Sequence, residues 1–146
     1  MPTGGDRRLY LFDSSAAVPL VVHDHDFHDA VLDIAERSHR GLAGHAWFET
    51  YSVLTRMPAG ARRSPQAVFA ALRATFPETR FLEPDAAMTL RGELAERGIA
   101  GGAVFDALVA AVARQMDAPL VTCDRRARAT YEALGVRVLW PEGMDR

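Results

Sequence analysis

The sequence predicts an α/β fold, a three-layer α/β/α sandwich built around a mostly parallel central sheet. Two short apolar runs, residues 9–12 and 119–122, are typical of strands buried on both faces, and segments with apolar residues at helical spacing lie between them. Strands that alternate with helices form parallel sheets covered on both faces. A chain of 146 residues, 49% of them apolar, can fill one core but not two of ordinary size. Residues 1–146 are therefore expected to form a single domain.

The first half of the chain predicts one central strand followed mainly by helices. After a polar lead-in at 1–8, the expected elements are a strand at 9–12, a helix from Ser14 or Ser15 to about 22, a helix from about 27 to 38, a very short strand at 42–43 and a helix at 46–57. Asp24 or Asp26 is expected to cap the second helix, and Gly41 to end it. The run at 23–29, His-Asp-His-Asp-Phe-His-Asp, favours a solvated turn over a histidine metal site, because it lacks a ligand pair on one helical face.

The second half repeats the alternation. The expected elements are a helix at 65–75, a strand at 79–82, a helix at 86–97 capped by Asp85 and stopped by Gly98, a helix at 101–114, a strand at 119–122, a helix from 125 to about 134 and a strand at 136–139. Positions 104–113 are almost wholly small and apolar, which predicts a helix buried nearly all round. Asp106 interrupts it. A buried, unpaired carboxylate costs on the order of several kcal/mol, so Asp106 needs a cation or a proton.

Composition excludes several classes of chemistry. The formal charge is -2, so the overall electrostatics give no case for nucleic-acid binding, and any such case must be local. All 17 basic residues are arginine, which excludes a P-loop and a lysine Schiff base. The single cysteine, Cys123, excludes an internal disulfide and a multi-cysteine zinc site, and it is expected to be a packed core thiol. Neither a secretory signal nor a membrane span is evident, so a cytoplasmic protein is expected.

Four carboxylates are placed to meet at one edge of the predicted sheet. Asp13 and Asp124 follow the two buried strands, and Glu49 and Asp106 lie near the N-terminal turns of helices that should begin at the same edge. Four acids without a basic partner repel one another and favour a divalent cation between them. Mg²⁺ suits oxygen ligands, with Mn²⁺ as a substitute. Such a site suits metal-assisted attack on a phosphodiester.

Arginines follow the last of these acids directly. Arg125, Arg126 and Arg128 are placed to hold a nucleic-acid backbone beside the site. A solvated helical face explains the same three residues equally well, so both interpretations stay open.

Four stretches carry the acids: Leu-Phe-Asp13-Ser-Ser, Trp-Phe-Glu49-Thr-Tyr-Ser-Val-Leu, Phe-Asp106-Ala-Leu-Val-Ala-Ala-Val-Ala and Leu-Val-Thr122-Cys-Asp124. In order and spacing they resemble the four acidic motifs of PIN domains, and the chain length is similar to that of the VapC-like toxins of type II toxin-antitoxin systems. The resemblance implies a magnesium-dependent ribonuclease, restrained by a cognate antitoxin whose C-terminal segment occupies the cleft, and often a homodimer. It implies that the four carboxylates are the metal ligands and catalytic residues, with Ser14 and Thr122 as supporting hydroxyls.

One departure from the family pattern concerns the number of metal ions. Many relatives carry a further acidic residue or Asn shortly after the fourth motif, where this chain has Arg125 and Arg126. One or two ions therefore remain open, as do the RNA, its cleavage site, the antitoxin and the dimer surface.

Two alternatives compete with a ribonuclease. A PIN-like RNA-binding protein without turnover is disfavoured, because all four acids are present. A phosphatase that uses an Asp after its first strand requires a second Asp two residues later, where this chain has Ser15. It also requires a lysine, and the chain has none.

Overall fold

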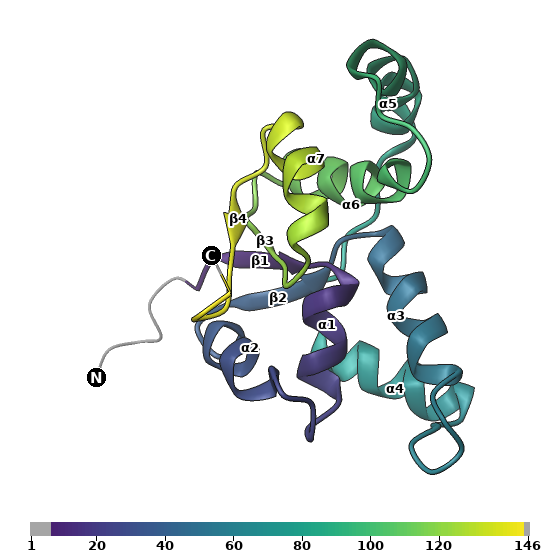
Figure 1. The fold of residues 1–146 in the computed structure, drawn as a ribbon, viewed down its shortest axis with the longest axis vertical. Helices are drawn as coiled ribbons and strands as arrows, with labels where there is room; N and C mark the ends of the chain where they lie inside the picture. The colour runs from purple at the N-terminus through teal and green to yellow at the C-terminus, as the bar shows by residue number, and fades with distance from the viewer. Residues whose placement is uncertain (1–6, 145–146) are drawn as a thin grey trace.

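A computed structural model describes residues 7–144 of the chain. Its centre is a four-stranded parallel sheet in the order β2-β1-β3-β4 (Figure 1). The strands are β1 (Leu9–Phe12), β2 (His39–Leu42), β3 (Leu120–Val121) and β4 (Val138–Leu139). The predicted α/β class and parallel sheet are confirmed. The part of the lead-in at 1–6 lies outside the described residues.

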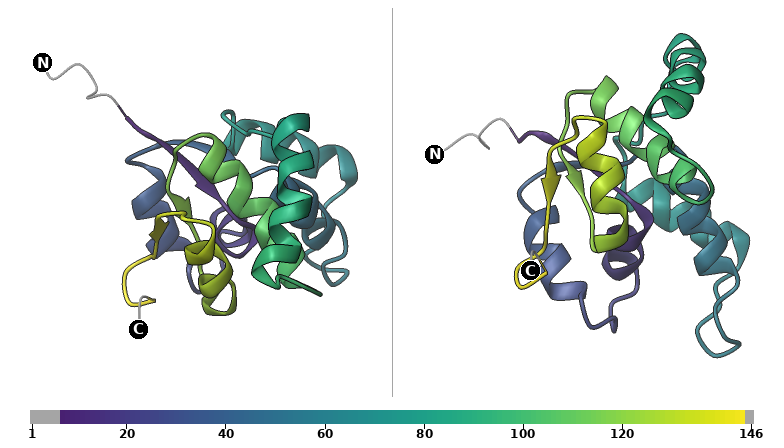
Figure 2. Two further views of the ribbon diagram at one scale, coloured as in Figure 1. Left: turned by 90° about the horizontal axis from the view of Figure 1, so that it is seen from above. Right: turned by 45° about the horizontal axis from the view of Figure 1, so that its top comes forward.

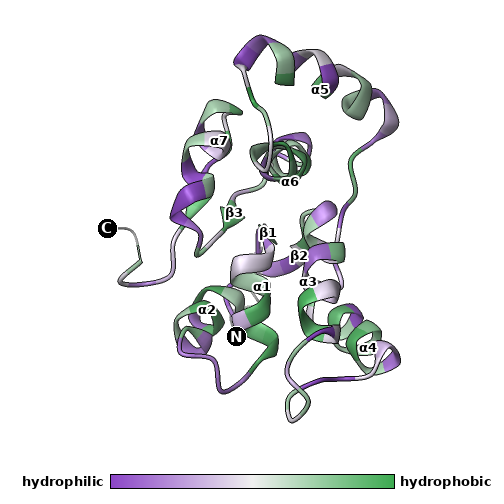
Figure 3. Ribbon diagram, turned by 45° about the vertical axis from the view of Figure 1, so that its right-hand side comes forward, coloured by the Kyte–Doolittle hydropathy of each residue, from purple (hydrophilic) through white to green (hydrophobic). Residues whose placement is uncertain are grey.

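Helices cover both faces of the sheet. They are α1 (Ser14–Val21), α2 (His28–Ala35), α3 (His45–Thr55), α4 (Pro65–Thr75), α5 (Pro84–Arg97), α6 (Ala103–Gln115) and α7 (Arg128–Ala133), with a 3-10 turn at Arg125–Ala127 before α7. Helices α1, α2 and α4 lie on one side, while α6 and α7 lie on the other and α5 packs outside α6 (Figure 3). Helix α7 runs beside β4 (Figure 2). Among residues 7–144, no helix combines the length and the apolar character that crossing a bilayer requires.

The central strands form the core, as their apolar sequence predicts. Leu11 and Phe12 of β1 and both residues of β3 are fully buried. The Phe12 ring meets Phe76 edge-on at a centroid distance of 5.5 Å. This packing fixes the carboxyl end of β1, and with it the position of Asp13.

The second strand differs from the prediction. Gly41 does not end a helix: α2 stops at Ala35, and Gly41 lies inside β2. Of the strand predicted at 42–43, Leu42 is the last residue of β2, and Ala43 forms only an isolated bridge. A Cβ atom on Gly41 would lie 2.0 Å from the carbonyl oxygen of Glu78, so glycine is needed for close packing rather than for a helix stop. The strand expected at 79–82 is reduced to one bridge between Ala43 and Arg80.

Three helix caps also differ. Asp13 itself caps α1 by accepting from the Ala16 N–H, so neither serine does. Helices α2 and α5 begin without a side-chain cap, so Asp24, Asp26 and Asp85 do not cap them. The run at 23–27 does form turns before α2. Gly98 stops α5 in the left-handed conformation as expected.

Helix α5 is tied to α6 by an ion-pair cluster around Glu93. Its carboxylate accepts from both terminal nitrogens of Arg114 on α6, each at 2.8 Å, and from Nε of Arg97 at 2.9 Å. The hydrogen bonds from Arg114 are the main reason that the pKa of Glu93 falls to about 2, with Arg97 adding to the effect. The cluster holds the outermost helix in place.

Glu93→Gln should therefore destabilise the protein near neutral pH. We expect a loss of about 1 kcal/mol in the free energy of unfolding, since solvent screens the partly exposed arginines. Because the folded pKa is depressed, this contribution is full above the unfolded pKa near 4.5 and fades as pH falls toward about 2. Urea unfolding at pH values between about 7 and 3 checks this. Exposed Glu96→Gln is the control, and equal stability of the two variants at pH 7 would contradict the prediction.

Candidate active site

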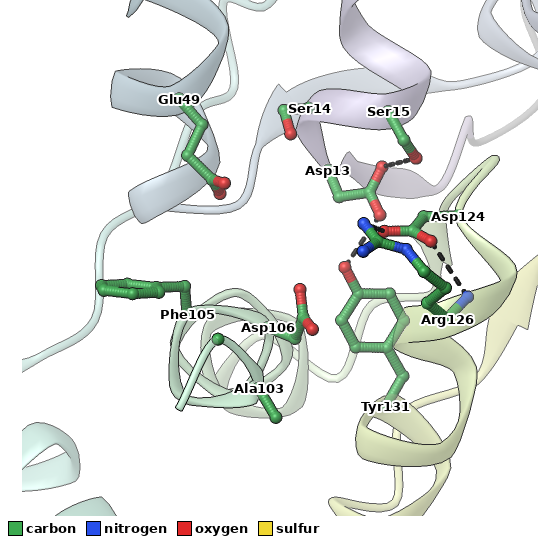
Figure 4. Close-up of a pocket in the computed structure, with 11 residues that line it drawn as sticks. Asp13, Ser14, Ser15, Glu49, Ala103, Phe105, Asp106, Asp124, Arg126 and Tyr131 are labelled. Carbon is green, nitrogen blue, oxygen red and sulfur yellow. Dashed lines mark hydrogen bonds and ion pairs between the residues drawn. The ribbon is translucent and has the colours of Figure 1, made fainter. Parts of the chain in front are cut away.

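The four predicted carboxylates line one pocket of about 460 Å³ at the carboxyl edge of the sheet (Figure 4). Asp13 follows β1, Asp124 follows β3, Glu49 comes from α3 and Asp106 comes from the first turn of α6. Residues more than a hundred positions apart are thus brought together because β1 and β3 are adjacent parallel strands. This is the edge at which open α/β sheets bind ligands.

Asp13 is the most enclosed of the four, with 4% of its surface exposed. Its Oδ1 accepts from the Ser15 hydroxyl at 2.6 Å and from the Ala16 N–H at 3.1 Å. Its Oδ2 accepts from the Thr122 hydroxyl and from the Tyr131 hydroxyl, the latter at 2.8 Å. Burial raises the pKa of Asp13, and these hydrogen bonds oppose the rise by stabilising the anion.

Backbone groups orient two of these donors. The N–H of Cys123 donates to Ser15 Oγ at 2.8 Å, and the N–H of Asp124 donates to Thr122 Oγ1 at 3.0 Å. Each hydroxyl accepts from the backbone and points its own proton at Asp13. The end of β3 and the start of α1 are therefore joined through the carboxylate of Asp13.

Glu49 and Asp106 are half-buried and share an electrostatic field. Burial raises the pKa of Glu49 most, followed by the negative charges of Asp106, Asp13 and Asp124. Burial also leads for Asp106, whose pKa is raised further by Asp124 and Asp13. The four acids are thus close enough to oppose one another's ionisation, which favours a cation among them.

The burial patterns of α3 and α6 explain the positions of both acids, and Asp106 lies in a first helical turn. Helix α3 buries Ala46, Thr50 and Leu54 at a spacing of four, so Glu49 lies beside that stripe and faces the pocket. In helix α6 every residue from Ala107 to Ala113 is buried except the half-buried Leu108, so its burial begins one residue after Asp106 and not at 104. An acid in a first helical turn is also favoured by the helix dipole.

One arginine shares the pocket. The backbone N–H of Arg126 donates to Asp124 at 2.9 Å, and its guanidinium lies 3.4 Å from the same carboxylate. Its side chain is 92% exposed, so it is not a buried counter-ion, although its charge lowers the pKa of Asp106. Arg125 is exposed, and Arg128 pairs with Glu132 at 2.8 Å. Of the three predicted arginines, Arg126 alone lines this pocket.

The chemistry of the lining fits a hard divalent cation. The pocket offers carboxylate and hydroxyl oxygens, with no histidine or thiol among its lining residues. Among residues 7–144, no group of three or more His, Cys, Asp or Glu side chains is arranged so that it could hold a metal ion. The pocket is therefore a candidate site and not a formed metal centre.

The sequence did not reveal every residue of the pocket. Ser14 lines the pocket as expected, but the hydroxyl that binds Asp13 belongs to Ser15. Tyr131 also lines the pocket, and no local pattern predicts this, because a buried Tyr needs a hydrogen-bond partner that the sequence does not identify. Cys123 is half-buried at the margin of the core, and burial raises the pKa of its thiol to about 12.

A known protein family and a named relative both match most of this chain. The profile of the PIN domain matches residues 10–133. The chain is 42% identical over 127 residues to "Ribonuclease VapC27" of Mycobacterium tuberculosis, covering 87% of this chain and 93% of that protein.

Two solved structures share the fold. "FitAcB from Neisseria gonorrhoeae" has a TM-score of 0.63 at 18% identity, over 89% of this chain and 96% of that one. "VapBC2 from Rickettsia felis bound to a DNA fragment from their promoter" has a TM-score of 0.61 at 16% identity, over 90% of this chain and 98% of that one.

Proposed function

Because this chain belongs to the PIN-domain family, we propose that the acidic pocket is the active site of a metal-dependent endoribonuclease. The protein is a VapC-family ribonuclease, the toxin component of a type II toxin-antitoxin system. The resemblance seen in the sequence is thereby confirmed, and the phosphatase alternative has no support.

The observation that carries the proposal is the convergence of four acids from separate elements on one pocket. Asp13, Glu49, Asp106 and Asp124 would hold Mg²⁺, with Mn²⁺ as a substitute. The ion would activate water and stabilise the leaving oxygen of a phosphodiester. Ser15 and Thr122 orient the carboxylate of Asp13 by donating to it, and Ser14 adds a hydroxyl to the pocket wall.

The pocket also contains a group suited to an RNA phosphate. Arg126 is almost fully exposed at the rim, and its long contact with Asp124 leaves most of its donors free for a phosphate oxygen. Arg125 and Arg128 lie on the adjoining turn and would extend the contact along the backbone.

Two protein partners complete the proposal. A cognate antitoxin would restrain the nuclease by placing its C-terminal segment in the cleft, and the toxin would form a homodimer. Support for the antitoxin comes from the VapC membership and from the fold shared with the VapBC2 and FitAcB structures. The homodimer rests on the family resemblance alone.

Divalent metal should raise the melting temperature of the purified protein. At a concentration a hundredfold above Kd, binding to the folded state alone adds about 2.7 kcal/mol, or about 5–10 °C. Thermal unfolding in EDTA and with increasing Mg²⁺ or Mn²⁺ measures the shift, and RNA cleavage in the same buffers should appear only with metal. A melting temperature indifferent to millimolar metal would contradict the four-acid site. RNA binding without any cleavage would instead favour a protein without turnover.

A further inference from the structure

The carboxylate of Asp13 has no free position for a metal ion in this structure. Each carboxylate oxygen presents two lone pairs in the carboxylate plane. Ser15 and the Ala16 N–H donate to Oδ1, while Thr122 and Tyr131 donate to Oδ2. The four donors equal the acceptor capacity of the carboxylate, so an ion that binds Asp13 must displace one donor.

Three of these four donors are fixed by further interactions of their own. The Ala16 N–H belongs to the first turn of α1, where Asp13 caps the helix. Ser15 and Thr122 each accept a backbone N–H, and their hydroxyls lie 3.2 Å apart. Displacing any of them would disturb the cap or the junction between β3 and α1.

The Tyr131 hydroxyl is not held in this way. Among the described residues, the hydrogen bond to Asp13 is the one formed by its hydroxyl. Tyr131 lines the pocket, as Ser15 does, whereas Thr122 does not. In Figure 4 the hydroxyl points toward Asp13, into the space between Asp13 and Asp106.

We propose that the Tyr131 hydroxyl occupies the place on Asp13 that a divalent cation takes, and that metal binding displaces it. The inference rests on the proposed function of the pocket. Before an ion arrives, the hydroxyl offsets part of the charge of a buried carboxylate that faces three other acids. The cost of breaking this hydrogen bond is then subtracted from the affinity for metal, so Tyr131 sets the metal concentration at which the nuclease becomes active.

The direction in which Tyr131→Phe changes the affinity for Mn²⁺ distinguishes this competing role from a positioning role. If Tyr131 merely oriented Asp13, its loss would weaken metal binding. If it competes with the ion, Tyr131→Phe should tighten Mn²⁺ binding by about tenfold, the order expected for one hydrogen bond to a charged group. Titration calorimetry and the loss of the free Mn²⁺ signal in electron paramagnetic resonance give Kd at pH about 8. Tyr51→Phe, which removes a hydroxyl from a ring stacked on Trp47 in α3, is the matched control and should leave Kd unchanged.

A second experiment follows metal binding in the unmodified chain and uses a variant only to assign one resonance. With tyrosine labelled by ¹³C at Cζ, the Tyr131 resonance should shift when diamagnetic Mg²⁺ binds, because the phenol loses its hydrogen bond to a carboxylate. Its resonance is assigned as the one that disappears in Tyr131→Phe, and those of Tyr10 and Tyr51 should stay in place.

The outcomes distinguish this inference from the proposed function. Mn²⁺ binding that is weaker or unchanged in Tyr131→Phe would overturn the inference, as would an unmoved Tyr131 resonance at saturating Mg²⁺. In both cases the nuclease site would stand, because the wild type binds metal. A wild-type protein that binds no Mn²⁺ at millimolar concentration would overturn both.

Discussion

Asp106→Asn should lower the rate of RNA cleavage by about a thousandfold or more while leaving the folded protein at least as stable as the wild type. A thousandfold loss corresponds to about 4 kcal/mol in the barrier, the scale of charge stabilisation lost with a metal ligand. Stability should hold because Asp106 is half-buried and its charge is opposed by Asp124 and Asp13. Removing the charge therefore relieves repulsion. Single-turnover cleavage of RNA in Mg²⁺, with thermal unfolding in EDTA, measures both effects.

Asp106 is a sharper test than Asp13. An Asn at 13 presents one amide nitrogen, which cannot accept either of the two donors that now converge on one oxygen of the carboxylate. A loss of cleavage there would mix catalysis with folding. Asp33→Asn is the matched control, since Asp33 is an exposed acid on α2 paired with Arg37. If Asp106→Asn cleaves RNA at a rate within tenfold of the control, Asp106 is not a metal ligand.

Strand ends and helix starts explain why much of the pocket was predictable. An apolar run that stops at a carboxylate places Asp13 and Asp124 at the same edge once parallel pairing is assumed, and the pairing of β1 with β3 is what the structure has. The positions of Glu49 and Asp106 have the same explanation, because crossover helices begin at that edge. These positions depend on the order of elements and not on details of packing.

The unpredicted contacts depend on side-chain direction. Ser14 and Ser15 are equivalent in the sequence, and only the path of α1 turns Ser15 toward Asp13 and the Cys123 N–H. Tyr131 reaches Asp13 because α7 packs against α6 and β4, a tertiary contact without local signal. Gly41 was expected to end a helix because glycine commonly does so, and the crowding that requires it comes from Glu78, far along the chain.

Gly41→Ala should produce the largest loss of stability among Gly→Ala changes at the glycines of residues 7–144. The added Cβ would lie 2.0 Å from the Glu78 carbonyl oxygen and 2.6 Å from the Thr79 backbone nitrogen. These are backbone atoms, so no side-chain rotation relieves the contact. We expect the free energy of unfolding to fall by about 3 kcal/mol, at the upper end of overpacking costs.

Hydrogen bonds prevent the neighbouring segment from moving aside. The Glu78 N–H donates to the Arg40 carbonyl at 3.1 Å, and the Leu42 N–H donates to the Thr79 hydroxyl at 3.0 Å. Shifting residues 78–79 outward would break both bonds, and shifting β2 would instead disturb its pairing with β1. The first route loses hydrogen bonds to β2, and the second loses pairing with β1, the strand that Asp13 follows.

Urea unfolding compares this variant with Gly92→Ala. Gly92 lies inside α5, and a Cβ atom added there would have nothing within 4 Å, so alanine should stabilise the protein by about 1 kcal/mol through helix propensity. The same added methyl group is thus expected to lower the free energy of unfolding at position 41 and to raise it at position 92. If Gly41→Ala unfolds at the same urea concentration as the wild type, the segment at 78–79 is free to yield, and β2 is not held against it by backbone contact.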